Sequence, residues 1–332
     1  MTGVRAGQIR GILDGKAKPL GSLGRIEDLA VLLGVLQDTN RPVVRDPVLL
    51  VFAGDHGAVA SGVSAFPSSV TAAMVATYLR GRAAANLFAR QAGMRMVVVD
   101  AGVLTDLPPQ PGLLSVRVAP GTQDWTRGPA MTPAEAQAAL DTAACVVDGL
   151  ADGGCTVLAL GDMGIGNTAS AALLAHKVAG LPLESLVGRG AGLDDAGLAR
   201  KQDAVAQGAA RTAPRLPPAA ALAEYGGFEV AMLAGAILQA ARRRMCVVVD
   251  GVIVTAAALV AHAMDPACLG ACVFAHRSAE RGHDAMLAHL GAEPLLDLGM
   301  RLGEGTGAAL AVPLLQAAAA VLSDMADLQD VL

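Results

Sequence analysis

Short apolar runs of strand length recur along this chain of 332 residues, and each ends at a turn rich in Gly, Asp or His. The runs are 48–52, 96–99, 157–160, 246–249 and 272–274, with a further candidate at 295–298. Ala-rich stretches of helical length lie between them, at 70–91, 133–152, 170–178, 228–242 and 255–264. Alternation of strand, polar turn and helix predicts βαβ units in a parallel sheet. Because the apolarity is continuous rather than alternating, both faces of that sheet are expected to be covered.

The two ends of the chain lack such runs. The first 40 residues are predicted to be helical around a KPLGSLGR loop, and the segment from about 308 to 332 is also predicted to be helical. Pro313 either kinks this last helix or begins a new turn in it. We therefore expect an α/β domain over 41–305 and a small helical domain built from 1–40 together with 306–332.

The polar turns are expected to form one site. Parallel crossovers are almost always right-handed, so the carboxyl ends of the strands share one edge of the sheet, and ligands bind at that edge. The turns concerned are AGDHG (53–57), DAG (100–102), GDMGIGN (161–167), DGV (250–252), AHRS (275–278) and GMRLGEG (299–305).

Composition excludes several classes of protein. With 17% charged and 53% hydrophobic residues the chain is not disordered. Aromatic residues make up 2%, and the net charge is −5 with scattered Lys and Arg, so no nucleic-acid partner is expected. The five cysteines predict no disulfide framework, and Cys268 and Cys272 are interpreted as a thiol pair rather than a zinc site. No metal site is predicted.

The sequence motifs also predict no signal peptide and no membrane-spanning segment. The first residues, MTGVRAGQIRGILDGKAKP, are too polar for a signal peptide. The stretch 245–264 resembles a membrane span, but Asp250 and Gly251 interrupt it, and an Asp in mid-span costs about 3 kcal/mol on insertion scales. We interpret it as a strand, a turn and a helix, and expect a cytoplasmic protein without a membrane partner.

Two glycine clusters invite a functional interpretation. In LALGDMGIGNTAS (158–170), three glycines form a turn after a strand, and Asn167 or Thr168 can cap the next helix. Such a turn binds phosphate when its amides are free, or it is an ordinary capped turn. In GRGAGLDDAGLARK (188–201), Asp194 and Asp195 suit a helix start, and Lys201 is either solvated or directed back at the strand edge.

Three further motifs leave alternatives open. Asp55 and His56 either perform acid–base chemistry or hold their turn by hydrogen bonds. The apolar loop 62–71 can wall a pocket for a flat ligand, and AHRSAERGH (275–283) suits a polar rim or a subunit contact. Glu304, bracketed by glycines at a predicted helix start, is either favoured there by the helix dipole or is a base exposed by small neighbours, and the dipole would keep it ionised.

Taken together, these strings resemble one family, the nicotinate-nucleotide–dimethylbenzimidazole phosphoribosyltransferases of cobamide synthesis. The matching strings occur in the family's order and cover nearly the whole chain. They are KPLGSLGRIEDLA (18–30), AGDHG (53–57), GVSAFP (62–67), VT (70–71), GDMGIGNT (161–168), GRGAGLDD with its following Lys (188–201), EVAMLAGAI (229–237), FAHRSAERGH (274–283) and PLLDLGMRLGEGTGAALA (294–311).

The resemblance implies a Rossmann-like parallel α/β sheet flanked by helices, with a small helical domain, in a homodimer. It implies transfer of phosphoribose from nicotinate mononucleotide to 5,6-dimethylbenzimidazole or a related base, giving α-ribazole phosphate and nicotinate, with Glu304 as general base and no metal or cofactor. It places the nucleotide's ribose and phosphate at Asp162, Met163, Gly164, Ile165, Gly166, Asn167, Thr168 and Lys201. It places the acceptor base at Ser64, Phe66, Ser68, Leu302 and Gly303.

Three positions depart from the family pattern. Asp162 stands where many members have Glu, Phe66 replaces a common Tyr, and Ala73 replaces an expected Gln. These changes bear on the acceptor base more than on the reaction, so a different acceptor is one alternative. A non-catalytic nucleotide-binding homologue is another. A dinucleotide-dependent oxidoreductase is disfavoured because no G-x-G-x-x-G with a downstream acid is present.

Overall fold

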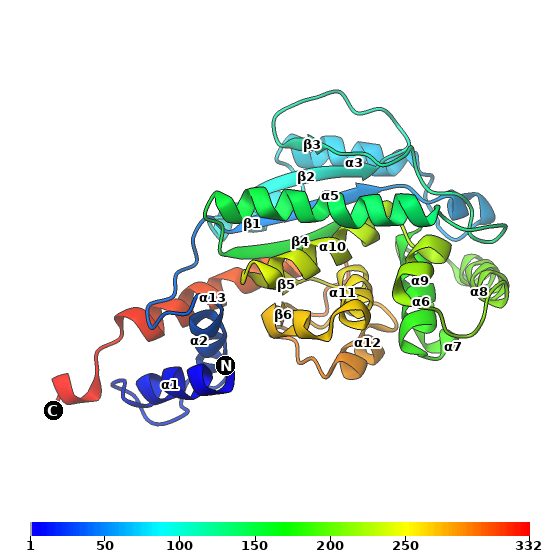
Figure 1. Ribbon diagram of the computed structural model, residues 1–332. Helices are drawn as coiled ribbons and strands as arrows, with labels where there is room; N and C mark the ends of the chain where they lie inside the picture. The colour runs from blue at the N-terminus through cyan, green and yellow to red at the C-terminus, as the bar shows by residue number, and fades with distance from the viewer. Residues whose placement is uncertain (1) are drawn as a thin grey trace.

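The computed structural model describes residues 2–332 and contains a six-stranded parallel sheet in the order β3-β2-β1-β4-β5-β6 (Figure 1). The strands are β1 Val48–Gly54, β2 Arg95–Gly102, β3 Leu113–Ser115, β4 Val157–Met163, β5 Cys246–Val249 and β6 Cys272–Phe274. The predicted α/β class is therefore confirmed. The run 295–298 is not a strand. It lies beside β6, with an isolated bridge between His276 and Leu296 and a hydrogen bond from Leu295 N to Phe274 O at 3.0 Å. The edge strand β3 was not predicted.

Helices account for most of the remaining chain. The α-helices are α1 Thr2–Asp14, α2 Arg25–Leu36, α3 Ser69–Leu79, α4 Ala84–Gln91, α5 Pro133–Asp152, α6 Asn167–Leu174, α7 Leu183–Leu186, α8 Asp195–Ala210, α9 Pro218–Tyr225, α10 Phe228–Arg242, α11 Val252–Met264, α12 His283–Leu290 and α13 Thr306–Asp324. Shorter turns are η1 Gly57–Ser61, the π-helical η2 Ala175–Ala179, η3 Pro266–Ala271 and η4 Leu328–Asp330.

Two helix predictions need correction. The stretch 70–91 forms two helices, because Gly81 adopts a φ of 72° and ends α3. At the other end of the chain, α13 continues through Pro313, so Pro313 does not begin a separate turn. By contrast, α5 has the predicted bounds, since Pro133 occupies its first turn and Thr132 and Glu135 form a capping box.

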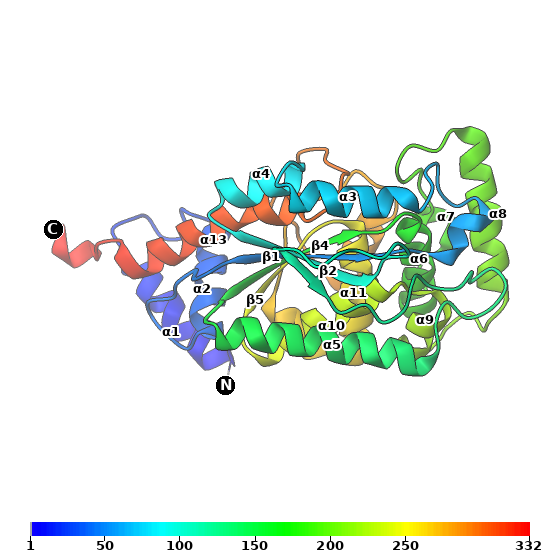
Figure 2. The ribbon, with the colours of Figure 1, turned by 90° about the horizontal axis from the view of Figure 1, so that it is seen from above.

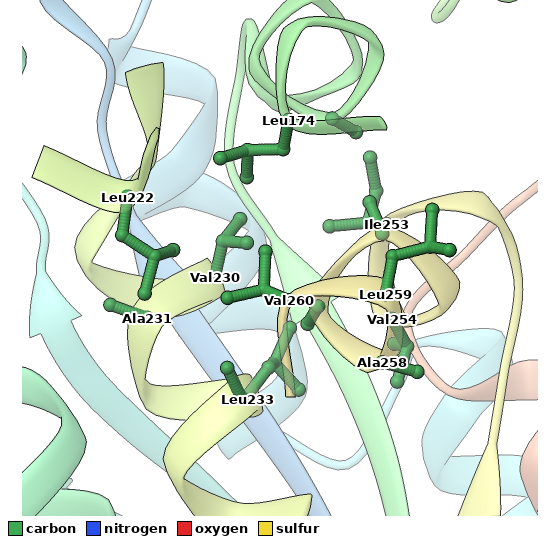
Figure 3. Packing of buried hydrophobic residues seen from close by; sticks show 14 of the residues in the cluster. Leu174, Leu222, Val230, Ala231, Leu233, Ile253, Val254, Ala258, Leu259 and Val260 are labelled. Atoms are coloured by element: carbon green, nitrogen blue, oxygen red, sulfur yellow. The ribbon is translucent and has the colours of Figure 1, made fainter. Parts of the chain in front are cut away.

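The core lies on both faces of the sheet, as predicted. All seven residues of β1 are buried, and successive side chains point to opposite faces. Leu50 and Phe52 belong to a cluster covered by α5, α10, α11 and α6, part of which is drawn in Figure 3. Leu49 and Val51 belong to a second cluster with α1, α2, α3, α4 and α13. Figure 2 shows α3, α4 and α13 on one side of the sheet and α5 and α10 on the other.

The helices from the two ends of the chain pack together. A Cβ on Gly34 would lie 2.7 Å from Ile9 Cδ1 and 3.3 Å from Leu322 Cδ2, so α2 is in close contact with α1 and α13. However, α13 also packs on β4, β5 and α4, and its residues share a hydrophobic cluster with β1. The division into two domains at 40/41 and 305/306 therefore stays a prediction.

One described helix, α13, is long and apolar enough to cross a membrane. Of its most apolar window, 56% is buried within the fold, so it is also a core helix. The stretch 245–264 contains the predicted strand, turn and helix, namely β5, a turn at Asp250 and α11.

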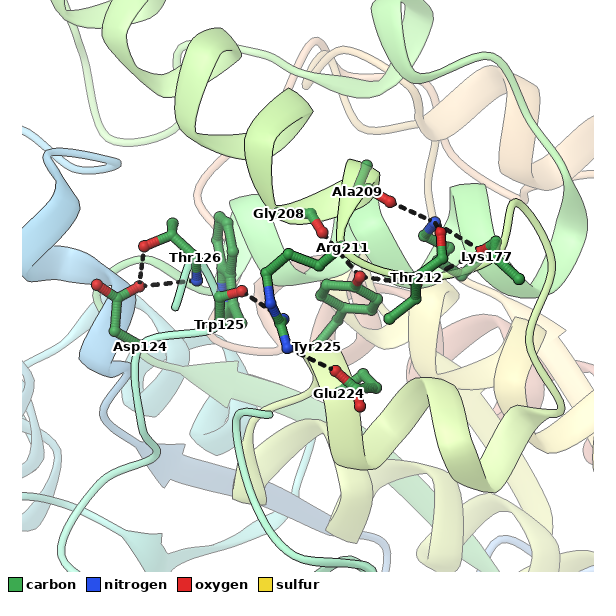
Figure 4. Close-up of polar contacts among 11 residues, drawn as sticks. Asp124, Trp125, Thr126, Lys177, Gly208, Ala209, Arg211, Thr212, Glu224 and Tyr225 are labelled. Carbon is green, nitrogen blue, oxygen red and sulfur yellow. Dashed lines mark hydrogen bonds and ion pairs between the residues drawn. The ribbon is translucent and has the colours of Figure 1, made fainter. Parts of the chain in front are cut away.

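A group of polar contacts fixes the carboxyl end of α8 (Figure 4). Lys177 Nζ donates to the carbonyl oxygens of Ala209 and Ala213, at 2.7 and 2.8 Å. Arg211 donates to Trp125 O at 2.7 Å, and the Tyr225 hydroxyl donates to Gly208 O at 2.8 Å. These bonds anchor the helix that carries Lys201.

Candidate active site

A cavity of about 430 Å³ lies at the carboxyl ends of the strands. It is bordered by the loop that precedes α3, the turn after β4, the start of α11 and the loop that precedes α13. Of the residues predicted from the sequence, Ser64, Phe66, Asp162, Met163, Gly164, Ile165, Gly166, Asn167, Thr168, Leu302, Gly303 and Glu304 line it. Lys201 and Ser68 do not. The cavity opens beside β4, next to β1, where the strand order reverses and where such sheets bind ligands.

The turn from β4 to α6 is built by close backbone contacts. A Cβ on Gly164 would lie 2.6 Å from Gly54 O, so only glycine lets this turn approach the end of β1. Gly166, with a φ of 95°, is the N-cap of α6 and is not joined by a capping side chain. The prediction that Asn167 or Thr168 caps the helix is therefore wrong. Asn167 lies in the first turn, and its Nδ2 donates instead to Asp162 Oδ2 at 2.9 Å.

Lys201 is fully buried rather than solvated. Its Nζ donates to Thr168 Oγ1 at 2.8 Å and to Gly188 O at 3.0 Å, so it joins both glycine clusters. Burial lowers the pKa of Lys201 to about 8, although the nearby Glu280 carboxylate opposes the shift. Lys201 reaches the cavity through Thr168. At the start of the same helix, Asp194 caps α8 by accepting from Gly197 N at 2.7 Å, as expected of a capping residue.

Glu304 is buried at the cavity in an unusual backbone conformation. Its φ is +64°, between Gly303 at +81° and Gly305 at +78°, and α13 begins directly afterwards at Thr306. Burial raises the pKa of Glu304, the nearby Tyr78 hydroxyl opposes this, and the charge of Asp250 adds to it. Burial therefore shifts this pKa in the direction opposite to the lowering that a helix dipole would give.

Two more carboxyl groups lie next to Glu304. Burial, reinforced by the charge of Asp250, raises the pKa of Asp162 to about 8. Asp250 is fully buried at the end of β5, and burial raises its pKa as well. Glu304 Oε2 is buried without a hydrogen-bond partner among residues 2–332. At neutral pH Asp162 therefore holds a proton, and Glu304 Oε2 is a free acceptor atom.

Asp55 and His56 hold their turn, and neither lines the cavity. His56 Nε2 is 2.6 Å from Glu229 Oε1, and its Nδ1 is 3.1 Å from Ser170 Oγ. Although burial lowers the pKa of His56, the Glu229 carboxylate raises it above the usual value. Asp55 Oδ2 accepts from Leu104 N at 2.8 Å, and burial raises the pKa of Asp55. Of the two interpretations of this motif, the structure supports hydrogen bonds that hold the turn, and their partners lie outside it.

Some residues of the motif 275–283 lie in the core, and others line the cavity. His276 and His283 are buried, and burial lowers the pKa of His283 to about 4. Ser278 and Glu280 line the cavity, where Glu280 Oε1 accepts from Gly190 N at 3.1 Å. Within the part of the chain that the structure describes, no group of three His, Cys, Asp or Glu side chains is arranged to hold a metal ion.

Sequence reasoning gave no individual role to Tyr78, Asp250, Ser278 or Glu280, although the last three lie in motifs that it noted. Asp250 carried a usable signal, because it directly follows a predicted strand at the edge where the other turns meet. Tyr78 carried none, since it is one apolar position among many in an Ala-rich helix.

The fold and the site define a class: a Rossmann-like α/β enzyme with a glycine-lined turn at the switch point of its sheet and carboxyl groups opposite. A phosphoribosyltransferase family model matches residues 5–331. The chain is 55% identical to the nicotinate-nucleotide–dimethylbenzimidazole phosphoribosyltransferase of Aromatoleum aromaticum, over 95% of this chain and 91% of that protein. It is 54% identical to the enzyme of the same name from Cupriavidus taiwanensis, over 96% and 92%.

A solved structure agrees with these relatives. The crystal structure of CobT from Thermus thermophilus superposes with a TM-score of 0.95 at 45% identity, covering 99% of this chain and 98% of that one. The chain belongs to the nicotinate-nucleotide–dimethylbenzimidazole phosphoribosyltransferase family and is a pentosyltransferase. The family resemblance inferred from the sequence motifs is thus confirmed.

Proposed function

We propose that this enzyme transfers the phosphoribosyl group of nicotinate mononucleotide to 5,6-dimethylbenzimidazole or a related lower-ligand base, with Glu304 as general base. The products are α-ribazole 5′-phosphate and nicotinate. The observation that carries the proposal is the buried Glu304 carboxyl group, which lines the cavity, has an unpartnered Oε2 and has a raised pKa. The names of the relatives supply the substrates.

The chemistry suits a single buried carboxylate. Nicotinate is attached through a pyridinium nitrogen, so it leaves with the bonding electrons and its ring becomes neutral. A nitrogen of the benzimidazole attacks the anomeric carbon from the opposite face, which inverts β to α. The other ring nitrogen then loses its proton to Glu304. General-base catalysis of this kind contributes on the order of 10²–10⁴-fold, and alignment of two bound substrates contributes as much or more. No metal or redox cofactor is required by this reaction.

We assign the nucleotide's ribose and phosphate to the turn from Asp162 to Thr168, with Lys201 behind it. A glycine-lined turn at a helix start favours an anion because backbone N–H groups and the helix dipole face it. Lys201 supports this assignment through its 2.8 Å bond to Thr168 Oγ1. When phosphate binds, this hydroxyl is held by a cation from behind.

We assign the acceptor base to the side of the cavity formed by Ser64, Phe66, Leu302 and Gly303. Phe66 and Leu302 are exposed at this border and offer apolar surface to a flat ring. Ser68 is half-buried and does not line the cavity, so its proposed role is to support the loop that carries Phe66. Ala73 is exposed and also lies off the cavity. We further propose a cytoplasmic homodimer.

The experiment is a turnover assay of Glu304→Gln with nicotinate mononucleotide and dimethylbenzimidazole, measuring released nicotinate. We expect kcat to fall by about 10²–10⁴-fold, with nucleotide binding by calorimetry nearly unchanged. Glu184→Gln, on an exposed position of α7, is the matched control and should keep full turnover. Unchanged turnover in Glu304→Gln would refute the role of Glu304. Absence of nicotinate release by the unmodified enzyme would instead favour a non-catalytic nucleotide-binding homologue, and offering several bases at once would reveal the preferred acceptor.

A further inference from the structure

We propose that Asp250 is a positioning residue that holds the turn 303–305 so that the Glu304 carboxyl group faces the substrate cavity. This inference rests on the proposed role of Glu304 as general base. Asp250 does not itself border the cavity, although the next residue, Gly251, does. It therefore acts through Glu304 and not on the substrate.

The contacts of Asp250 are with the backbone around Glu304. The side chain is fully buried at the end of β5. Its Oδ2 accepts a hydrogen bond from Gly305 N at 3.1 Å, and its Oδ1 accepts one from Ala308 N at 2.9 Å. The N-cap of α13, Gly305, has no side chain to satisfy these N–H groups. Asp250, at the end of β5, thus supplies the acceptor that a capping residue of α13 would provide.

The turn needs such a restraint because of its backbone. Three consecutive residues, Gly303, Glu304 and Gly305, have positive φ angles, and a side chain at positive φ is strained for Glu. Conformations of this kind persist only where the surrounding structure enforces them. Next to β4 the turn is held by close packing, since a Cβ on Gly161 would lie 2.6 Å from Glu304 C. On the β5 side it is held by the two hydrogen bonds to Asp250.

His276 closes the far side of Asp250. Its Nε2 is 3.6 Å from Asp250 Oδ1, and its ring packs on α13, where a Cβ on Gly307 would lie 2.0 Å from His276 Cδ2. Neither ring nitrogen has a hydrogen-bond partner among the described residues. The carboxylate is therefore confined between an imidazole and the start of α13, with both oxygens committed to the turn.

Asp250 also adjusts the basicity of Glu304. The ionisable groups that face Glu304 are Asp162 from β4, Asp250 from the end of β5 and Tyr78 from α3, with His276 behind Asp250. The negative charge of Asp250 raises the pKa of both Glu304 and Asp162. Removing that charge while keeping the shape of the side chain, as in Asp250→Asn, lowers both pKa values.

The test is Asp250→Asn, because an amide can accept through one atom only and carries no charge. We expect kcat to fall on the order of 10²-fold, as misplacement of a catalytic group by about 1 Å does, with the KM for the nucleotide little changed. The acid limb of the pH profile of kcat should move to lower pH. Asp265→Asn is the matched control, since Asp265 caps η3 away from the cavity and its loss should leave kcat and the pH profile unchanged.

A double-mutant cycle separates this role from a merely structural one. If Asp250 acts through Glu304, adding Asp250→Asn to Glu304→Gln costs little further activity. Independent losses that multiply, or an acid limb that does not move, overturn the proposal. Should Asp250→Asn not fold, judged by thermal unfolding and nucleotide binding, the same cycle is measured with the smaller Asp250→Ser.

The outcome also distinguishes the two proposals. Full activity in Glu304→Gln refutes the proposed function, whatever Asp250 does. Loss of activity in Glu304→Gln combined with full activity in Asp250→Asn refutes the positioning role alone.

Discussion

At the scale of single residues, Glu304 combines two features that rarely stabilise a protein. It is a buried carboxyl group with an unpartnered oxygen, and it has a left-handed backbone conformation that favours glycine. A non-glycine residue in this region costs about 1–3 kcal/mol. A side chain retained at such a cost is expected where function requires it, which agrees with a catalytic role.

This strain predicts opposite effects of two small substitutions. Both Glu304→Gly and Glu304→Ala remove the carboxyl group and should abolish most turnover. Glycine also relieves the positive φ, so we expect Glu304→Gly to be more stable than Glu304→Ala by about 1 kcal/mol. The free energy of unfolding in urea, measured at one protein concentration, checks the difference. Equal stability of the two variants would show that the backbone at position 304 is relaxed.

The sequence was informative about Glu304 for a local reason. Glycines on both sides of a lone acidic residue mark an exposed or strained turn, and that signal is contained in five residues, RLGEG. Its partner Asp250 is 54 residues away, and only the parallel pairing of β4 with β5 brings the two together. Side chains joined by long-range packing, such as Tyr78 on α3, are not visible in a local pattern.

At the scale of elements, the strongly apolar strands and the capped helices could be predicted, and the short or interrupted ones could not. The strands β1, β4 and β5 are continuous apolar runs between polar turns, and helices cover both of their faces. The strand β3 has three residues, two half-buried and one exposed, so it lacks the buried apolar run that marks the other strands. The run 295–298 is apolar except for Asp297, and it packs as a loop beside β6.

The contact between β4 and the turn before α13 predicts a sharp effect of one methyl group. In Gly161→Ala the new Cβ would lie 2.6 Å from Glu304 C and Gly305 N, both of which are backbone atoms. The turn must move, so we expect a loss of stability of about 1–3 kcal/mol and a fall in kcat on the order of 10²-fold.

The matched control for this substitution is Gly149→Ala in the interior of α5, where a Cβ meets no atom within 4 Å. There alanine should stabilise the helix by about 0.5–1 kcal/mol and leave turnover unchanged. Thermal unfolding and nicotinate release measure both effects. A fully active Gly161→Ala would mean that the turn adapts without displacing Glu304.

At the scale of the whole molecule, helices from both ends of the chain help to cover one face of the sheet. The helix α13 starts at the active-site turn, packs against β4 and β5 on the side of the sheet that also carries α3 and α4 (Figure 2), and contacts α1 and α2. The sequence indicated a helical unit made from both ends, but not that its longest helix shares a core with the sheet. One helix therefore joins the helices at the start of the chain to the turn that carries Glu304.

Stability against pH is also a property of the whole molecule, and the buried carboxyl groups determine its sign. Burial raises the pKa of Asp162 from 3.8 to about 8, so between these values the folded chain holds a proton that the unfolded chain has lost. The free energy of unfolding then falls as pH rises through this window and levels off above about pH 8. His56, Asp250 and Glu304, whose pKa values are also raised, act in the same direction.

Groups with lowered pKa values act in the opposite direction, and two of them, His283 and Lys201, do so in other windows. The pKa of His283 is lowered from 6.5 to about 4, so its effect ends near pH 6.5, and that of Lys201 is lowered from 10.5 to about 8, so its effect begins there. Between pH 6.5 and 8 we therefore expect stability to fall with rising pH, by up to about 1.4 kcal/mol per unit for each proton held. Asp162→Asn cannot release a proton and should flatten this slope.

The measurement is urea denaturation at pH 6.5, 7.2 and 8.0, at fixed protein concentration, for the unmodified chain and for Asp162→Asn. Asp195→Asn serves as the control, because its side chain is exposed on α8 and should leave the slope as it was. If Asp162→Asn and the unmodified chain lose stability in parallel, Asp162 is already ionised at neutral pH. Its carboxylate would then face Glu304 as a second negative charge, and a site built in that way would repel an anionic acceptor such as a phenolate while tolerating a neutral benzimidazole.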